Sequence, residues 1–585
     1  MTAARSGKPP ASGPEATAGA EMSRTAILLL FIGLMVSMFM FSLNQTVLAT
    51  ALPTIVGELD GVDLMLWVST AFMLASTIMM PVYGKIGDLF GRKPLFIFAI
   101  VMFMFGSLLA MLAQDMMLLI AGRVFQGIGG GGMMILSQAI IAAVVPARQR
   151  GKYMGIMGSV FAVSSVAGPL IGGWLTDGPG WRWAFAINFP LGIFAIVAAA
   201  LFLKIPRVTH EKRPKIDIGG MVLVAIFTSS VILVSAWGGH QYAWDSPVIL
   251  GMIAAALVAG IAFVFVERRV SEPVIPMTLF RDRNFVLATC AGLTIGVAMF
   301  GVLSYMPTYL QMVHGIDATV AGLMMVPMMG TMLVSSTAVG FIVARTGRYK
   351  AYPIVGMVLI VTALVFMSFM KADSHAVWSI LHLAGLGLGL GLSMQLLVLI
   401  VQNSFPIAIV GTATAANNFF RQIGATLGMA VIGALFTSRL MSNLSAVMPT
   451  GAGAQSANRL TPEAVSQMTG RLHDAVVTGY NDALMPLFLW VAPLPLIGLV
   501  FVLFIKEIPL ATRIDRASVP PRAVVAKAPA DPAHASLDTV DSAEDAEDEE
   551  RDDDGADDSD GGGQAATRSI RSTAGERRSP VGDRP

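Results

Sequence analysis

The chain has 585 residues, of which 55% are hydrophobic and only 13% are charged, and its mean hydropathy is +0.69. Soluble globular proteins carry roughly 25% charged residues, so this composition excludes an ordinary soluble protein and indicates a membrane protein. The net charge of +1 gives no reason to expect a nucleic-acid partner, and the single cysteine, Cys290, excludes an intrachain disulfide.

The apolar residues gather in segments that are long enough to cross a bilayer, which takes about 20 residues per helix. Residues 1–25 are polar and rich in Ala, Gly and Pro, without the pattern of a signal peptide, so we expect a disordered cytoplasmic segment before the first span. The long apolar runs lack the alternation of membrane β-strands, so helices are the predicted spans. We predict fourteen: 26–48, 64–83, 94–113, 117–143, 153–175, 184–203, 218–237, 247–266, 286–307, 320–343, 352–370, 377–401, 411–437 and 484–505.

Basic residues occupy every second loop between these spans. The loops on the other side are nearly bare of basic residues: acids stand at Glu58, Asp60 and Asp63, and the loops 238–246 and 308–319 hold no Lys or Arg. The arginines of the long loop over 438–482 count little, because long loops have little weight in this rule. Because basic loops stay in the cytoplasm, we predict that both termini are cytoplasmic and that the chain crosses the inner or plasma membrane many times. The basic loops contain Lys85, Arg92, Lys93, Arg148, Arg150, Lys152, Lys204, Arg207, Lys212, Arg213, Lys215, Arg268, Arg269, Arg281, Arg283, Arg345, Arg348 and Lys350.

The order of spans and loops predicts the domain organisation. Residues 26–203 form one six-helix bundle and residues 286–509 a second, while residues 204–285 supply two linking helices with cytoplasmic loops. A polar excursion over 438–482 is expected on the outer side. Residues 510–585 are Pro/Ala-rich and then acidic, so we expect a disordered cytoplasmic tail.

One loop motif occurs twice. The segment from Gly84 to Lys93 and the segment from Gly340 to Lys350 both have a Gly followed seven residues later by Gly-Arg, between two apolar spans. Many secondary transporters are built from duplicated halves, so this repeat predicts two pseudo-symmetric bundles.

Seven motifs together resemble those of the major facilitator superfamily, in its fourteen-helix drug–proton antiporter branch. The resemblance runs from about Thr25 to Pro509 and implies an all-α membrane fold of two six-helix bundles plus two extra linking helices. It also implies a small-molecule substrate, protons as coupling ions and the lipid bilayer as surroundings. The motifs are GKIGDLFGRK (84–93), RVFQGIGG (123–130), AGPLIGG (167–173), WRWAFAINFP (181–190), WGG (237–239), YMPTYLQ (305–311) and NFFRQIG (418–424).

The 84–93 loop is interpreted as a conformational latch. Gly84 and Gly91 permit tight turns and close approach of helices. Asp88 can lie at the positive N-terminal end of a neighbouring helix, while Arg92 and Lys93 pair with acids or lipid phosphates. Plain anchoring by positive charge is the alternative, but it explains Arg92 and Lys93 and leaves Asp88 unexplained.

The 167–173 motif predicts a bend in the fifth span, where the family places a kink of its exporters. Pro169 removes one backbone hydrogen bond in the middle of the membrane. Gly168, Gly172 and Gly173 offer a close-packing face to another helix, and a purely structural kink is the alternative.

Two arginines lie inside spans, where an unpaired guanidinium is costly. Arg123 has Gln126 one turn away and Asn44 and Gln45 of the first span as partners, and the resemblance gives it a part in proton coupling. A structural polar clamp is the alternative. Arg421 forms an analogous patch with its neighbours Asn417, Asn418 and Gln422.

The sequence departs from the family at Asn44, where drug-exporting relatives carry an aspartate. An asparagine does not titrate, and the predicted spans hold no acid in their middles. The acids near the spans lie at their ends, at Asp63, Asp88, Asp115, Asp217, Glu267 and Asp482. The remaining candidates for carrying the proton are Asp88, His382 and Asp217. Two arginines without mid-span acids suit anionic, neutral or amphipathic substrates better than a quaternary cation.

These observations predict a proton-coupled exporter of hydrophobic or amphipathic compounds that works by alternating access, as in multidrug efflux. A dedicated exporter of one endogenous metabolite, antibiotic or lipid remains the alternative. The sequence holds no nucleotide loop, metal cluster or nucleophile–base set, so an enzyme, a cofactor and a metal are not expected. A monomer is the working expectation for the oligomeric state, which the sequence leaves open.

Overall fold

The structure, a computed structural model, describes residues 24–203, 215–239, 241–445, 465, 467–468 and 470–512. In this part of the chain, fourteen helices are long and apolar enough to cross a membrane, which confirms the predicted number. The predicted disordered tails lie outside the described residues, except that the first helix already begins at Arg24.

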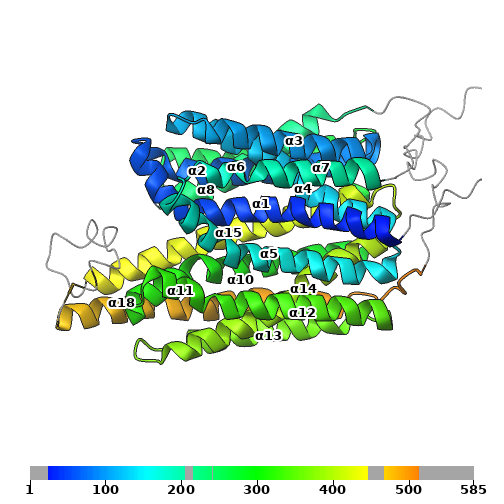
Figure 1. Ribbon diagram of the computed structural model, residues 1–585. Coiled ribbons are helices and arrows are strands. Elements are labelled where there is room, and N and C mark those ends of the chain that lie inside the picture. Colours follow the sequence, from blue (N-terminus) through cyan, green and yellow to red (C-terminus); the bar gives the residue numbers. More distant parts are fainter. Residues whose placement is uncertain are drawn as a thin grey trace, which may run out of the picture. The chain divides into compact units, whose positions relative to one another are not determined.

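The first half of the chain forms six of these spans, which lie side by side (Figure 1). Helix α3 packs against α4, and α1 packs against α5 and α7. The elements are α1 (Arg24–Glu58), the 3-10 helix η1 (Val62–Leu64), α2 (Met65–Phe90), α3 (Arg92–Met111), α4 (Met116–Val144), α5 (Ala147–Asp177) and α6 (Trp183–Ala186) with α7 (Asn188–Phe202) as one span.

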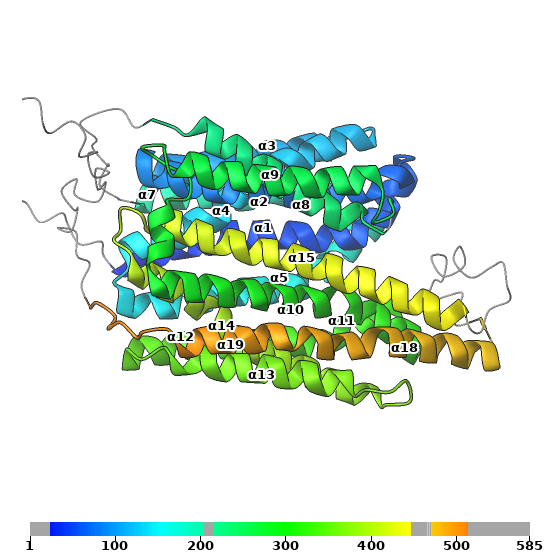
Figure 2. The ribbon, with the colours of Figure 1, turned by 180° about the vertical axis from the view of Figure 1, so that it is seen from behind.

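The linking helices α8 (Ile218–Trp237) and α9 (Pro247–Glu267) pack on each other, and α8 contacts both α2 and α15 (Figure 2). The second half follows them. Its elements are η2 (Met277–Arg281), α10 (Arg283–His314), α11 (Ala318–Met324) with α12 (Val326–Thr346), α13 (Ala351–Ser368), α14 (Ala376–Ser404), α15 (Val410–Ser445) and α18 (Arg471–Val491) with α19 (Pro493–Leu503).

Local sequence signals set several helix ends. Asp115, Asp217 and Asp282 each cap a helix, because their carboxylates accept a hydrogen bond from a backbone N–H of the first turn. Ser246 caps α9 in the same way, and Pro247 follows it at the first helical position. At the other end of α12, Gly347 adopts the left-handed conformation (φ 77°) that favours glycine.

The predicted outer loop over 438–482 is wrong at both ends. Helix α15 continues to Ser445, and α18 already begins at Arg471. The hydropathy signal ended earlier because these turns carry polar residues, but Leu444, Val476 and Tyr480 are buried there. Asp482, predicted at a span end, therefore lies three turns inside α18, where it is exposed.

Each half has its own apolar core. In the first half, α4 lies between α2 and α3 on a run of glycines that admits both neighbours. A Cβ on Gly129 would lie 2.4 Å from the carbonyl oxygen of Ala99 in α3, and one on Gly131 would lie 2.3 Å from that of Ser76 in α2. The glycines of the 123–132 segment therefore fix how closely these helices pack.

Candidate functional site

A cavity of about 870 Å³ lies between the two halves, with a lining drawn from both. Its floor lies midway along the helices, at Met80, Gln138 and Met394, and it extends toward the helix ends near Gly173 and Thr319. We call these ends the open end. The other end of the helices, which holds Asp88 and Arg92, is called the basic end.

The two halves are joined at the basic end by Asp88 of α2. One carboxylate oxygen accepts hydrogen bonds from the Thr412 backbone N–H (2.7 Å) and from its hydroxyl (2.9 Å), at the start of α15. The other oxygen accepts from two nitrogens of Arg92. Asp88 thus occupies the positive N-terminal end of a neighbouring helix, as the sequence predicted.

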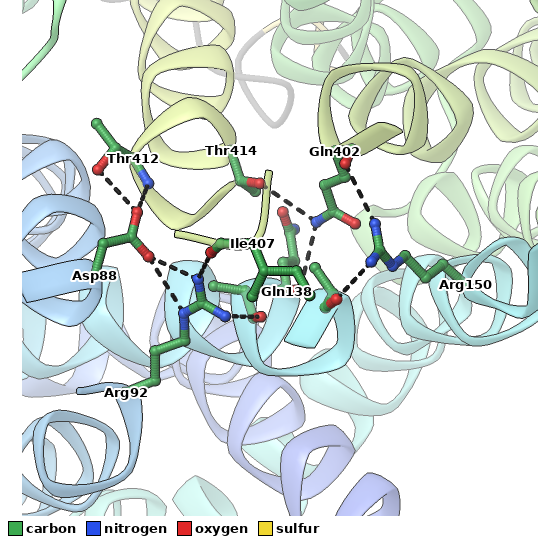
Figure 3. A network of polar contacts seen from close by, with 10 residues as sticks. Asp88, Arg92, Gln138, Arg150, Gln402, Ile407, Thr412 and Thr414 are labelled. Carbon is green, nitrogen blue, oxygen red and sulfur yellow. Dashed lines mark hydrogen bonds and ion pairs between the residues drawn. The ribbon is translucent and has the colours of Figure 1, made fainter. Parts of the chain in front are cut away.

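Arg92 completes this junction. Its guanidinium donates to the Ile407 carbonyl of the second half at 2.7 Å and to the Ala139 carbonyl of α4 at 3.1 Å. Figure 3 shows Asp88 and Arg92 together directed at the start of α15. The side chains of this ion pair are only 7% and 4% exposed, so its charges are shielded from water and salt.

A second set of contacts across the basic end involves Arg150 at the start of α5. It donates to the Gln402 carbonyl of α14 at 3.2 Å, while its other nitrogens bind carbonyls of its own half. The Gln402 amide in turn donates to the Gln138 carbonyl and to the Thr414 hydroxyl (Figure 3). The cavity is therefore sealed below its floor by polar contacts between the halves.

Glycines let the backbones approach at this seal. A Cβ on Gly84 would lie 2.4 Å from the Cβ of Ala415 in α15, and Gly91 adopts a φ of 98° between α2 and α3. Lys93 differs from the prediction, because it donates to the Ala200 carbonyl at 2.7 Å within its own half and not to an acid. Its long side chain reaches the C-terminal end of α7, whose last carbonyls attract a cation.

The second copy of the loop lies at the same end. Gly340 of α12 packs on Gly151 of α5, since a Cβ there would lie 2.4 Å from the Gly151 carbonyl oxygen. Arg148 donates to the carbonyls of Ala344 and Arg345. The pair α5–α12 thus repeats the role of the pair α2–α15, which fits two pseudo-symmetric bundles.

Arg123 lies outside the cavity, in a buried network of neutral groups. It donates to the side-chain oxygens of Asn44 and Gln126 and to the Val68 carbonyl. Its guanidinium also stacks 4.2 Å from the centre of the Phe72 ring. The predicted partners Asn44 and Gln126 are in contact with it, and the set matches a structural clamp.

Gln45 was wrongly predicted as a partner of Arg123. It is exposed and lines the cavity instead. The reason is helix geometry, since neighbouring positions of one helix point about 100° apart and only one of them faces α4.

Arg421 and Asn418 of α15 form a different kind of patch. Arg421 lines the cavity and donates to the Asn418 side-chain oxygen at 2.6 Å. Asn418 donates to the Gln138 side-chain oxygen at 2.9 Å, which joins the two halves at the cavity floor. The predicted analogy with Arg123 is therefore limited, because only Arg421 faces the cavity.

The glycines of the 167–173 motif divide between two faces of α5. A Cβ on Gly168 would meet the Thr46 side chain, and one on Gly172 would meet Thr50 and the Val47 carbonyl of α1. Gly173 was wrongly assigned to this packing face, since nothing lies within 4 Å of its Cβ position. Gly173 and Pro169 line the cavity instead.

The three predicted proton carriers lie in different surroundings. Both oxygens of Asp88 are hydrogen-bonded. His382 stacks on Phe366 and Trp378 and does not line the cavity. Asp217, at the start of α8, lies next to a second acid.

That second acid is Glu267, at the end of α9, which the sequence placed at a span end without a role. Both acids are more than nine-tenths buried. A Cβ added to Gly220 would lie 2.4 Å from the Oδ2 atom of Asp217 and 2.8 Å from the Oε1 atom of Glu267. The two carboxylates are therefore near neighbours. The Asp217 Oδ2 atom has no hydrogen-bond partner among the described residues.

Sequence reasoning also missed polar residues at the floor of the cavity and in the seal below it, namely Gln138, Gln402 and Thr412. Gln138 carried a usable signal, because it is a polar side chain inside the predicted span 117–143, whereas Gln402 lies one residue beyond the predicted span 377–401. Thr412 carried none, since a threonine near a helix start is ordinary and its partner Asp88 is 324 residues away.

Comparisons with known proteins agree with this arrangement. Residues 34–429 match the family model described as Major Facilitator Superfamily. An uncharacterized MFS-type transporter of Mycobacterium tuberculosis is 38% identical over 84% of this chain and 71% of its own length. The multidrug transporter protein MdtP of Bacillus subtilis is 33% identical over 85% of this chain and 95% of its own.

Among solved structures, that of the proton:xylose symporter XylE shares the fold. Its TM-score is 0.52 at 15% identity, over 83% of this chain and 96% of the other. The family model covers more than half of the chain, and the fourteen helices, the duplicated halves and the central cavity fit it. The chain belongs to the Major Facilitator Superfamily.

Proposed function

We propose that the protein is a proton-coupled exporter of hydrophobic or amphipathic small molecules. The observation that carries this proposal is a large cavity between duplicated halves, sealed at one end by the contacts of Asp88 and Arg92. The names of relatives support it, since MdtP and a second Bacillus subtilis protein, 32% identical, are called multidrug proteins. Ten methionines among the lining residues give the cavity a deformable apolar wall that suits varied compounds.

The basic end is proposed to face the cytoplasm, with both chain ends on that side. The support is the concentration of Lys and Arg in the loops of this end. In this orientation the cavity faces the outside of the cell, as in the step that releases an exported compound. Breaking the contacts at the basic end and forming new ones at the open end gives the opposite state.

Transport by inverted vesicles tests this proposal directly. With a pH gradient imposed, we expect addition of lipophilic dyes and drugs to release protons from the vesicles, and the dyes to accumulate inside. Vesicles without the protein supply the control. Response to a single compound out of a broad panel supports the dedicated exporter instead, and transport that ignores the pH gradient contradicts proton coupling.

The proton is proposed to be carried by Asp217 and Glu267 on the linking helices. A proton taken up by one of two neighbouring buried carboxyl groups removes the repulsion between their charges. Both Glu267 oxygens accept backbone hydrogen bonds, from Val274 and Ile275, so the free Oδ2 of Asp217 is the atom available to hold the proton. The neighbouring Glu272 pairs with Lys85 of α2 at 2.8 Å, so this region is connected to the helix that bears Asp88. A change of charge there can therefore reach the seal.

We expect Asp217→Asn to abolish pH-driven transport while leaving substrate binding within about twofold. Asparagine keeps the acceptor oxygen that caps α8 through the Gly220 N–H, so the helix start is retained. His382→Asn serves as the control, because this side chain stacks on Phe366 and Trp378 and has no second acid beside it, so it is expected to retain coupling. Full coupling in Asp217→Asn contradicts the assignment, and loss of coupling in His382→Asn alone assigns the proton to His382 instead.

A further inference from the structure

The cavity wall holds a single charged side chain among its described lining residues, that of Arg421. Among the residues that the structure describes, no Asp, Glu or His lines the cavity. The rest of the wall is apolar or neutral, with amide groups at Gln45, Gln138, Gln395 and Gln422. An occupant of the cavity therefore meets one positive charge and no negative charge.

Most of the hydrogen-bonding capacity of Arg421 is unused. A guanidinium carries five N–H donors, and the bond to Asn418 is the one that Arg421 donates within the described chain. No carboxylate of the described residues forms an ion pair with it. Arg123 is the internal contrast, because its guanidinium is bonded to three different residues and covered by the Phe72 ring.

The groups around Arg421 hold it in place and leave its charge uncompensated. Asn418 is itself fixed by Gln138 and by the Thr414 carbonyl, so the hydrogen bond from Arg421 sets the direction of the guanidinium. In the same wall, the Gln395 side-chain oxygen has no hydrogen-bond partner. A charge without a counter-ion in an apolar surrounding is costly, and a bound anion removes that cost.

Resting on the proposed export function, we propose that the preferred substrates are amphipathic organic anions whose acidic group binds Arg421. A carboxylate, sulfonate or phosphate oxygen pair matches the planar fork of a guanidinium, which can donate two parallel hydrogen bonds to it. The apolar body of the substrate lies against the methionines of the wall, such as Met73, Met299 and Met329. A cationic drug finds no partner here and is repelled by Arg421.

The test uses the full chain in liposomes of neutral lipid, with three probes of one size class: a lipophilic carboxylate fluorophore, its methyl ester and a rhodamine cation. We expect the wild type to bind and transport the carboxylate at least tenfold better than the cation. Arg421→Gln is expected to lower the ratio of carboxylate binding to ester binding about 10- to 100-fold, with both probes measured on the same variant. Arg421→Lys keeps the positive charge and loses the planar fork of donors, so its affinity for the carboxylate should lie between those of the wild type and of Arg421→Gln.

The outcomes separate the substrate class from the export function itself. Transport of the ester and the cation with no preference for the carboxylate overturns the proposal and leaves export intact. Failure to transport any probe under a pH gradient is a failure of the export function. Transport of the ester by Arg421→Gln also shows that the variant is folded, so an unchanged affinity for the carboxylate in this variant overturns the proposal as well.

An added arm identifies the source of the anion. Liposomes that contain phosphatidylglycerol present an anionic headgroup to the same site. If this lipid competes with the carboxylate fluorophore in wild type and not in Arg421→Gln, the acidic group bound by Arg421 includes lipid phosphates. Absence of competition assigns the site to free amphipathic anions.

Discussion

Asp88→Asn is expected to abolish export by opening the basic end. One carboxylate oxygen of Asp88 accepts two hydrogen bonds from Thr412, and the other accepts from Arg92. In asparagine an NH₂ group takes the place of one of these oxygens, and because this group donates and does not accept, the hydrogen bonds on that side are lost. The ion pair itself lies within one half, so only the hydrogen bonds from Thr412 to Asp88 and from Arg92 to the Ile407 carbonyl differ between the closed and open states. Losing one hydrogen bond to a charged group costs about 1.5–3 kcal/mol, so the closed state should lose a factor of roughly 10–100 in population.

The change of state can be measured with a cysteine at Ile135. This residue is fully buried and packs with Met80 and Ala415 between the halves. In a Cys290→Ser background, we expect Ile135→Cys to react slowly with a membrane-impermeant thiol reagent added to inverted vesicles. Adding Asp88→Asn should raise that rate at least tenfold.

Asp115→Asn is the matched control. Asp115 is also a carboxylate at a helix N-terminus, but it caps its own helix α4 through the Leu118 N–H and does not join the halves. The Asp115→Asn variant is expected to retain export, and the cysteine at position 135 should react as slowly as it does without this substitution. Equal labelling in Asp88→Asn and in wild type contradicts the role of Asp88 as a latch.

The number and order of the spans could be predicted from the sequence because each span is a continuous apolar run. Bilayer thickness and backbone hydrogen bonding leave a helix as the solution for such a run. Helix ends were less predictable. The first turns of α18 carry Arg471 and Asp474, so they lie below any hydropathy threshold, yet Val476 and Tyr480 bury one face and extend the helix.

The parts of the site that follow from one helix were also predictable. Arg123 and Gln126 lie three residues apart and were expected to meet, as they do. Contacts between the halves were not predictable residue by residue, since they depend on how two bundles rotate against each other. The repeated glycine motif indicated at which end a latch lies, but the partners Thr412, Ile407 and Gln402 follow only from the three-dimensional arrangement.

Faces within one helix showed the same limit. Asn44 and Gln45 are chain neighbours of similar chemistry, and Gly172 and Gly173 are identical residues. In each pair the first residue packs against a helix and the second faces the cavity. A sequence motif names both members, while the rotation of the helix decides their roles.

The pair Gly172 and Gly173 provides the second prediction of large effect. A Cβ on Gly172 would lie 2.2 Å from the Thr50 hydroxyl oxygen and 2.8 Å from the Val47 carbonyl oxygen, which is backbone and cannot rotate away. We expect Gly172→Ala to push α5 away from α1, with a loss of about 1–3 kcal/mol in stability, as is typical of overpacking. Gly168→Ala should act in the same direction, since its Cβ would overlap the Thr46 hydroxyl.

Gly173→Ala is the internal control for this prediction, because it is the same substitution at the next position of the same helix. Nothing lies within 4 Å of the added Cβ, and alanine is the better helix former, so the apparent Tm should stay level or rise slightly. Thermal unfolding in detergent compares the three variants, and vesicle transport shows whether the loss of packing also stops export. If Gly173→Ala lowers the Tm as much as Gly172→Ala does, the motif acts as a whole through helix bending. Helices α1 and α5 both line the cavity on the side of the first half. If Gly168→Ala and Gly172→Ala alone lower the Tm and also reduce export, the motif acts by holding these two helices in close contact.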